Sequence, residues 1–276
     1  HLKGTAAMYT RILVPVDGSD FSEQILPHEV WLGSKTGAAV SLLRLVESPE
    51  ALADAKRALD ILAARHAATA VCTAGSGDVA QLILDEAAKV PGTLVAITSH
   101  GRSGVMRALL GSTALNVLRA GREPLLVYRP PTDEGEPVPR QIDRIVVPLD
   151  GSELSESIEP LAAEFARWIG ARIVVASVVD PMAREAVPDA ASSDVVESGY
   201  VHARAAHLAE RYGIDVGWEV LHGDPETAIP NFVRSLPNTM LAMTTRGRSA
   251  VQSALLGSVT AASLRDGGAP VLTRMG

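Results

Sequence analysis

The feature that most constrains this chain is a glycine-rich stretch that occurs twice. Residues 100–112 have the sequence His-Gly-Arg-Ser-Gly-Val-Met-Arg-Ala-Leu-Leu-Gly-Ser, and residues 246–258 have the sequence Arg-Gly-Arg-Ser-Ala-Val-Gln-Ser-Ala-Leu-Leu-Gly-Ser. A short apolar run precedes each copy, at 94–98 and at 240–244. The repeat predicts two domains of one fold, 8–130 and 141–276, joined by a linker at 131–140 that is rich in proline and acidic residues.

Each glycine-rich stretch is a candidate phosphate cradle. Glycine lets backbone N–H groups come close to an oxyanion, and a serine at a helix start adds a hydroxyl where the helix dipole favours negative charge. Neither copy has the G-x-x-x-x-G-K-[ST] pattern of a P-loop. Arg102 and Arg248 are candidates to contact phosphate, with plain solvation as the alternative. His100 is Arg246 in the second copy, which argues against catalysis by an imidazole.

Each half begins with an apolar run that ends in Asp-Gly-Ser, at 11–19 and at 144–152. A nearly continuous apolar run is typical of a strand buried on both faces, and the proline inside each run should mark where the strand's pairing ends. Apolar residues at three- and four-residue spacing in 158–169 then predict an amphipathic helix. Gly33 and Gly170 are expected to end the helices that follow the two runs.

Strands and helices should alternate through both halves. Further strands are expected at 40–46, 70–73, 94–98 and 124–128, and at 172–179, 216–222, 240–244 and 270–274. Strand–helix–strand connections imply parallel pairing with right-handed crossovers. The expected fold class is α/β, with two tandem doubly wound domains that each contain a five-stranded parallel sheet with helices on both faces. The second copy is 13 residues longer between its second and third strands, and we expect this length in a surface loop.

The Asp-Gly-Ser turns and the glycine-rich stretches should form one pocket in each half. In a doubly wound sheet, ligands bind beyond the carboxyl ends of the strands where the winding reverses, and strands one and four are neighbours there. Asp17 or Asp150 would lie on one side and the phosphate cradle on the other. Such a carboxylate can accept a hydrogen bond from an adenine amino group or a ribose hydroxyl. The alternative is a turn that only caps the next helix.

Composition gives no support to several other functions. The net charge of −7 gives no basic field for nucleic acid, and no apolar run approaches the ~18 residues of a membrane span. The single cysteine, Cys72, excludes an intrachain disulfide and is expected to be a small buried residue. No Ser-His-Asp or metal-ligand set repeats, Ser99 and Ser103 have no support as nucleophiles, and His202 and His207 are expected on the surface. We therefore expect a cytoplasmic protein with no catalytic residues and no metal held by side chains.

From Thr10 to its end, the sequence resembles the universal stress protein family, here as a tandem member. The family's nucleotide signature is G-x2-G-x9-G-[ST]. Gly101 and Gly247 match its second glycine, and 111–112 and 257–258 match its final Gly-Ser. Thr98 and Thr244 occupy the position of the first glycine, which puts the shape of the loop or its affinity in doubt, because threonine does not adopt positive φ easily.

The resemblance implies a strand order of 3-2-1-4-5 and one bound ATP, or another adenine nucleotide, in each domain, with Mg²⁺ carried by the phosphates. It implies that the strand-one acids meet adenine or ribose, that strand-two residues line the adenine, and that the glycine-rich turn wraps the phosphates. The implied nucleotide-binding residues of the first copy are Val16, Asp17, Gly18, Leu45, Thr98, Ser99, His100, Gly101, Arg102, Ser103, Gly104, Gly111, Ser112 and Thr113. Those of the second copy are Leu149, Asp150, Gly151, Val178, Asp180, Thr244, Thr245, Arg246, Gly247, Arg248, Ser249, Ala250, Gly257, Ser258, Val259 and Thr260.

The function expected from this resemblance is a nucleotide-dependent regulator of a stress response that is not an enzyme. Ala114 stands where the second copy has Thr260, so the second site should be more complete in this respect. The alternatives are a protein-interaction module with degenerate pockets and, more weakly, a slow ATPase. The fifth strands of the two copies are expected to pair as a pseudo-dimer, and the chain is expected to form a homodimer and to act on an unidentified signalling protein.

Overall fold

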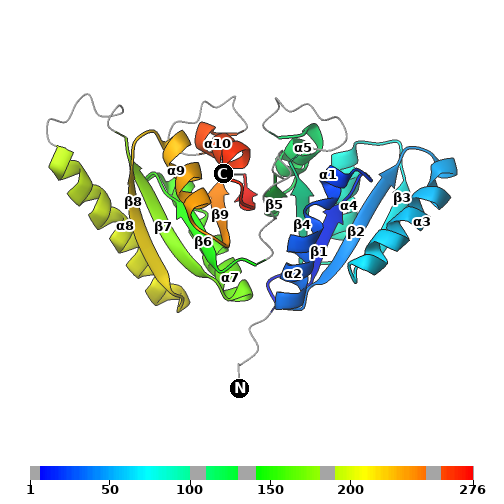
Figure 1. Ribbon diagram of the computed structural model, residues 1–276, viewed down its shortest axis with the longest axis horizontal. Helices are drawn as coiled ribbons and strands as arrows, with labels where there is room; N and C mark the ends of the chain where they lie inside the picture. Colours follow the sequence, from blue (N-terminus) through cyan, green and yellow to red (C-terminus); the bar gives the residue numbers. More distant parts are fainter. Residues whose placement is uncertain (1–6, 100–109, 130–140, 181–189, 247–255, 276) are drawn as a thin grey trace, which may run out of the picture. The chain divides into compact units, whose positions relative to one another are not determined.

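A computed structural model describes residues 7–99, 110–129, 141–180, 190–246 and 256–275 (Figure 1). The chain divides into two compact units, His1–Gln141 and Ile142–Gly276, which we call domain 1 and domain 2. The predicted linker at 131–140 lies outside the described residues.

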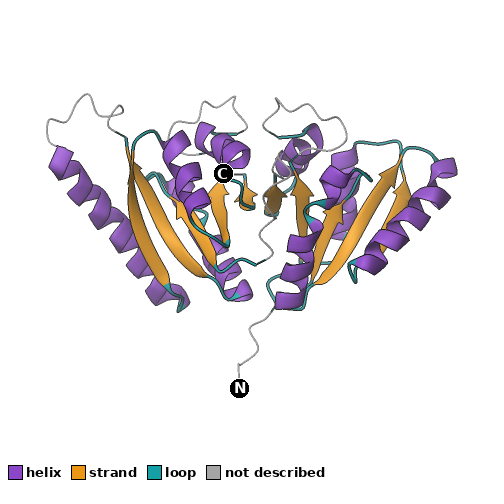
Figure 2. Ribbon diagram, viewed as in Figure 1, coloured by secondary structure: helices purple, strands orange, loops and turns teal. Residues whose placement is uncertain are grey.

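Domain 1 is a parallel sheet with strands in the order β3-β2-β1-β4-β5. Its elements are β1 (Arg11–Pro15), α1 (Asp20–Glu23), α2 (Leu26–Thr36), β2 (Ala39–Val46), α3 (Pro49–Arg65), β3 (Thr69–Ala74), α4 (Val79–Ala88), β4 (Thr93–Thr98), α5 (Ser112–Ala120) and β5 (Leu125–Tyr128). The strand order reverses after β3, so right-handed crossovers place α2 and α3 on one face and α4 and α5 on the other (Figure 2).

Domain 2 repeats this design in the order β8-β7-β6-β9-β10. Its elements are β6 (Arg144–Pro148), α6 (Glu153–Glu156), α7 (Glu159–Ile169), β7 (Arg172–Val179), α8 (Ala190–Tyr212), β8 (Val216–His222), α9 (Pro225–Ser235), β9 (Thr239–Thr244), α10 (Ser258–Asp266) and β10 (Val271–Arg274). The predicted α/β class and the order 3-2-1-4-5 are therefore confirmed in both halves. No helix in the described ranges is both long and apolar enough to cross a membrane.

The central strands form the core of each domain. Ile12, Leu13 and Val14 of β1 are fully buried, as expected for an apolar strand covered on both faces. β1 ends at Pro15 and β6 ends at Pro148, which confirms that the two prolines mark the ends of these strands.

The expectation that Gly33 ends a helix is wrong. α2 continues to Thr36, and its last turn is closed by Gly37 in the left-handed region at φ 80°. Gly33 lies inside α2, where a Cβ would be 2.7 Å from Cγ2 of Val40, so glycine is needed there for close helix–sheet packing. Gly170 does end α7, with φ 71°.

Two other expectations also need correction. Cys72 is only half-buried, because it lies on β3, the last strand of the domain 1 sheet, whose side chains are all at least partly exposed. The extra length of domain 2 is not all loop, because α8 has 23 residues and the corresponding α3 has 17. The segment 181–189 lies outside the described residues.

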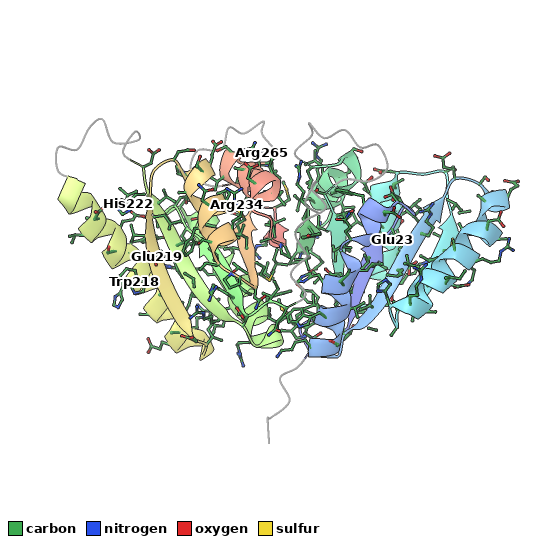
Figure 3. All side chains as sticks on the ribbon, viewed as in Figure 1. Glu23, Trp218, Glu219, His222, Arg234 and Arg265 are labelled. Atoms are coloured by element: carbon green, nitrogen blue, oxygen red, sulfur yellow. The ribbon has the colours of Figure 1, made fainter. Side chains whose placement is uncertain are left out.

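His202 and His207 are exposed on α8, as predicted, and the ring of His202 lies 6.0 Å from that of Trp218 on β8. Figure 3 shows where Trp218 lies.

A buried ion pair ties β1 to α4 in domain 1. Nη1 of Arg11 lies 3.4 Å from Oε1 of Glu86, and both side chains are less than a tenth exposed. Arg11 also donates from Nη2 to the carbonyl oxygen of Glu86 at 2.7 Å and from Nε to Oγ1 of Thr93 at 2.9 Å. Glu86 has a second partner, Lys89, whose Nζ lies 2.7 Å from Oε2.

Arg11→Ala is expected to destabilise domain 1 by about 2–3 kcal/mol, since removing one partner leaves a buried charge poorly compensated. The loss in free energy of unfolding should be small for a broken buried ion pair, because Lys89 still pairs with Glu86. Urea denaturation measures the loss. Arg144→Ala is the matched change in domain 2, where the hydrogen bonds of the arginine side chain to described residues are to the carbonyl oxygen of Pro237 and to Oγ1 of Thr239, both at 3.4 Å. An equal loss for both variants would show that the ion pair is not the cause.

Candidate functional site

Each domain has a cavity at the carboxyl ends of its strands. The cavity of domain 1 has a volume of about 390 Å³ and that of domain 2 about 110 Å³. In both, the lining comes from the end of the first strand, the second strand, the fourth strand, and the starts of the helices before and after that fourth strand. This is the place where the winding of the sheet reverses.

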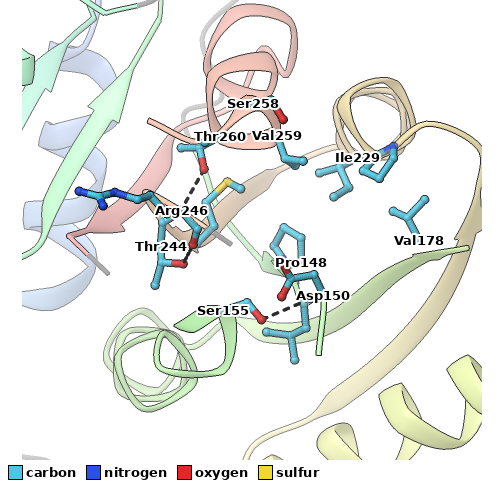
Figure 4. A pocket seen from close by; sticks show the side chains of 14 residues that line it. Pro148, Asp150, Ser155, Val178, Ile229, Thr244, Arg246, Ser258, Val259 and Thr260 are labelled. Carbon is cyan, nitrogen blue, oxygen red and sulfur yellow. Dashed lines mark hydrogen bonds between the residues drawn. The ribbon is translucent and has the colours of Figure 1, made fainter. Parts of the chain in front are cut away.

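The cavities bring together many of the residues predicted from sequence. In domain 1 these are Val16, Asp17, Leu45, Thr98, Ser99, Gly111, Ser112 and Thr113. In domain 2 they are Leu149, Asp150, Val178, Thr244, Arg246, Gly257, Ser258, Val259 and Thr260, several of which Figure 4 shows. His100, Gly101, Arg102, Ser103 and Gly104, and likewise Gly247, Arg248, Ser249 and Ala250, lie outside the described residues.

A few predicted residues do not line a cavity. Gly18 and Gly151 adjoin it in the turns after the first strands, with φ near 75° and 77°. Asp180 follows β7 without lining the pocket. Thr245 is fully buried, and its Oγ1 lies 3.8 Å from Sδ of Met275, which places the side chain against the chain's last residues instead. The side chain of Arg246 extends away from Asp150 and Val178 in Figure 4.

The acid after each first strand also organises its own turn. Oδ1 of Asp17 accepts hydrogen bonds from the Ser19 N–H at 3.0 Å and from the Ser19 hydroxyl at 2.5 Å. Ser19 in turn caps α1 by accepting from the N–H of Ser22 at 3.2 Å. Asp150 makes the corresponding bonds to Ser152 at 3.0 and 2.6 Å. Each aspartate therefore orders the turn before a helix and also lines the cavity. A carboxylate has enough acceptor sites to bond the turn and a ligand at the same time.

The threonines at the first position of the glycine pattern are not strained. Thr98 and Thr244 are the last residues of β4 and β9, so their backbones are extended and no positive φ is required. Oγ1 of Thr244 donates to the carbonyl oxygen of Arg246 at 2.6 Å and so holds the start of the following segment. Threonine at these two positions is therefore not strained, and the segments 100–109 and 247–255, whose shape was in doubt from the sequence, lie outside the described residues.

The glycine-rich segments are closed at their base by a backbone hydrogen bond. The N–H of Gly111 donates to the carbonyl oxygen of Ser99, and the N–H of Gly257 donates to that of Thr245 at 2.6 Å. The ends of each segment are therefore held together directly beside the cavity.

The helices that begin at these glycines have no side-chain cap. Gly111 and Gly257 are the N-caps of α5 and α10, and neither position makes a side-chain cap hydrogen bond. Their φ angles are −63° and −67°, values that any residue adopts, so backbone conformation does not require glycine. Ser19, Asp78, Ser152 and Asp224 cap α1, α4, α6 and α9 with their side chains, whereas α2, α3 and α7, like α5 and α10, have no side-chain cap hydrogen bond. Both helix starts line a cavity, where the N–H groups of a helix's first turn and the helix dipole favour an anion.

Thr260 ties α10 to β9 in domain 2 only. Its Oγ1 donates to the carbonyl oxygen of Thr244 at 3.0 Å (Figure 4), and the side chain is 2% exposed. Domain 1 has Ala114 at this position. We expect Thr260→Ala to cost domain 2 about 1 kcal/mol, because a buried acceptor loses its donor. Hydrogen exchange in α10 and β9 should then be about fivefold faster. Thr260→Ser keeps the hydroxyl and should exchange at nearly the wild-type rate, whereas equal acceleration in both variants would point to the lost methyl group.

Sequence reasoning missed Arg44, a cavity residue of domain 1. Arg44 lies on β2, and its Nη1 is 3.5 Å from the carbonyl oxygen of Val16. The corresponding residue of domain 2, Ser177, is buried and donates to Glu197 of α8. A charged residue inside an otherwise apolar strand was the available signal. No cluster of residues that could hold a metal ion occurs in the described part of the chain.

The sequence matches the universal stress protein family over residues 8–129 and again over 141–273. The chain belongs to this family. A universal stress protein of Methanocaldococcus jannaschii is 27% identical over 135 residues, which cover 47% of this chain and 79% of that protein. The tandem arrangement predicted from the repeat is confirmed.

Two solved structures show the same fold along nearly the whole chain. A universal stress protein from Archaeoglobus fulgidus has a TM-score of 0.64 at 19% identity, and the match covers 97% of this chain and 98% of that one. A putative universal stress protein from Pseudomonas aeruginosa has a TM-score of 0.67 at 17% identity, covering 98% and 95%. At these identities the likeness concerns the fold.

Proposed function

We propose that each domain binds one adenine nucleotide and that the chain acts as a nucleotide-dependent regulator of a stress response. The observation that carries this proposal is the start of α5 and of α10. At each, a glycine that the backbone does not require is the N-cap of a helix whose first turn lines a cavity, and it makes no side-chain cap hydrogen bond. An N–H-lined, positively polarised helix start is suited to phosphate.

The rest of each cavity suits the remainder of a nucleotide. In this proposal the phosphates lie at Ser112 or Ser258, and any Mg²⁺ is held by the phosphates. The apolar side chains of Leu45 and Ile83 in domain 1, and of Val178 and Ile229 in domain 2, would face the base. Asp17 and Asp150, beside the first strands, would accept from ribose or adenine. The glycines present at the cradle, rather than larger capping residues, fit such a ligand.

We propose binding without catalysis as the main activity. Among the described residues that line the domain 2 cavity, Asp150 is the only acidic residue and there is no histidine. Oδ1 of Asp150 already accepts hydrogen bonds from Ser152. A general base must reach the attacking water, and this carboxyl group stands on the β6 side, across the cavity from α10. The alternative of degenerate pockets, motivated by Thr98 and Thr244, stays open, although the extended backbones of these threonines carry no strain. The homodimer and the signalling partner stay predictions.

Mass spectrometry of the ligand that denaturation releases from freshly purified protein tests the proposal. We expect an adenine nucleotide, and its mass would also distinguish ATP from ADP. Preparations that release no nucleotide and then take up no added ATP would contradict the proposal. Turnover of ATP that disappears in Asp17→Ala and Asp150→Ala variants would favour the slow ATPase instead.

A further inference from the structure

Arg44 places a positive charge against the turn that follows β1. Its guanidinium packs on Gly18 so closely that a Cβ at this glycine would lie 2.5 Å from Nη1. Nη1 also lies 3.5 Å from the carbonyl oxygen of Val16, and Arg44 is part of the cavity lining together with Asp17. Gly18, at φ 75°, therefore serves both the bend of the turn and the approach of the arginine.

Arg44 and the start of α5 lie on opposite sides of Asp17. In the sheet of domain 1, β2 pairs with one edge of β1 and β4 pairs with the other. Arg44 belongs to β2, α5 follows β4, and Asp17 follows β1 between them. A ligand that reaches from the start of α5 across β1 therefore meets the guanidinium of Arg44 at its other end, where the carboxylates of Asp17 and Glu47 also line the cavity.

Among the residues of domain 2 that the structure describes, the position equivalent to Arg44 carries no charge. Ser177 occupies the position of Arg44, is 2% exposed, and is hydrogen-bonded to Glu197 of α8. Arg246 is the only arginine among the described lining residues of domain 2, and its side chain extends away from Asp150 and Val178 (Figure 4). The cavity of domain 2 is also smaller, about 110 Å³ against about 390 Å³. The two pockets therefore differ at the end remote from the helix start.

We infer that domain 1 selects an adenine nucleotide that carries an additional phosphate on its ribose, and that Arg44 determines this specificity. The inference rests on the proposed function of the same pocket. A carboxylate beside a ribose accepts from its hydroxyl groups, whereas an arginine nearby accommodates a phosphate attached to that ribose. The planar guanidinium binds phosphate oxygens through paired, charge-assisted hydrogen bonds. Domain 2, with Asp150 and a neutral serine, takes a nucleotide whose ribose hydroxyls are unmodified.

The test compares AMP with two bisphosphates that differ from it only by an added phosphate on the ribose. Calorimetry measures the affinities of AMP and of adenosine 3′,5′- and 2′,5′-bisphosphate for the full chain carrying Gly257→Glu, which closes the pocket of domain 2. We expect one of the bisphosphates to bind about tenfold more tightly than AMP, as an added charge-assisted phosphate contact would give. Arg44→Ser, which introduces the domain 2 residue, should remove this preference. Arg44→Lys keeps the charge and should retain part of it.

Three outcomes separate this inference from the proposed function. A bisphosphate-to-AMP ratio that is the same in Arg44→Ser as in the parent chain would overturn the role of Arg44, with nucleotide binding intact. A parent chain that binds both bisphosphates no better than AMP would overturn the selectivity. Failure of AMP, ADP and ATP alike to bind would instead contradict the proposed function. Unchanged circular dichroism and melting temperature of Arg44→Ser show that the fold is retained.

Discussion

A chain that carries both Gly111→Glu and Gly257→Glu is expected to bind nucleotide at least about a hundredfold more weakly than the wild type, because like charges brought together at a binding site cost several kcal/mol. The φ angles of −63° and −67° accept glutamate without backbone strain. An acidic residue at a helix start is itself favourable with respect to the helix dipole, so the fold should be retained. The new carboxylates would occupy the positions at which we place the phosphates. Calorimetric titration with ATP measures the effect.

Gly199→Glu is the matched control for this double variant. It adds the same side chain to α8, where a Cβ at this exposed glycine would meet no atom within 4 Å, and it should bind ATP as the wild type does. Wild-type affinity in the double variant would show that the starts of α5 and α10 do not bind phosphate. A loss in Gly199→Glu of the same size would trace the effect to net charge.

Glu29 should make domain 1 less stable as the pH rises. This residue of α2 is fully buried, and neither carboxyl oxygen has a hydrogen-bond partner in the described structure. Burial raises the pKa of its carboxyl group from 4.5 to about 8. At neutral pH the group is therefore protonated in the folded chain and ionised in the unfolded chain. Because the unfolded state then binds fewer protons, the free energy of unfolding falls between pH 4.5 and about 8 and is largest below this range.

Glu29→Gln is expected to remove a pH dependence of about 4 kcal/mol between pH 5 and pH 8, at roughly 1.4 kcal/mol per pH unit. The amide cannot ionise, so the variant should gain on the wild type as the pH rises. Urea denaturation followed by the fluorescence of Trp31, with Trp168 and Trp218 replaced by phenylalanine throughout, reports on domain 1. Glu164→Gln, at an exposed position of α7, is the control and should leave the slope unchanged. Parallel stability–pH curves for wild type and Glu29→Gln would contradict the assigned pKa.

Most of the fold could be predicted from the sequence because its signals are local and occur twice. The expected strands at 172–179 and 216–222 have the same bounds as β7 and β8. The strand order came from the resemblance, since periodicity identifies elements but not their neighbours. Gly33 was misplaced because a glycine that ends a helix and one that permits close packing look alike in sequence. Only the contact with Val40 distinguishes them.

The candidate site was predictable where the two copies agree and not where they differ. Asp17, Asp150 and the Gly-Ser pairs repeat at matching positions, and the structure places them at the cavities. Arg44 was missed because its counterpart is Ser177, so comparing the copies hides it. The direction of a side chain is also not encoded in spacing. Arg246 follows a strand that ends at the pocket, yet its side chain extends away from Asp150.

The most direct measurement is the number of nucleotides that the purified chain binds. After any co-purifying ligand has been removed, calorimetric titration with ATP should give about two sites per chain, and the single variants Gly111→Glu and Gly257→Glu should each give about one. Titration that shows no saturable binding of ATP, ADP or AMP by the folded wild-type chain would contradict nucleotide binding by the two pockets.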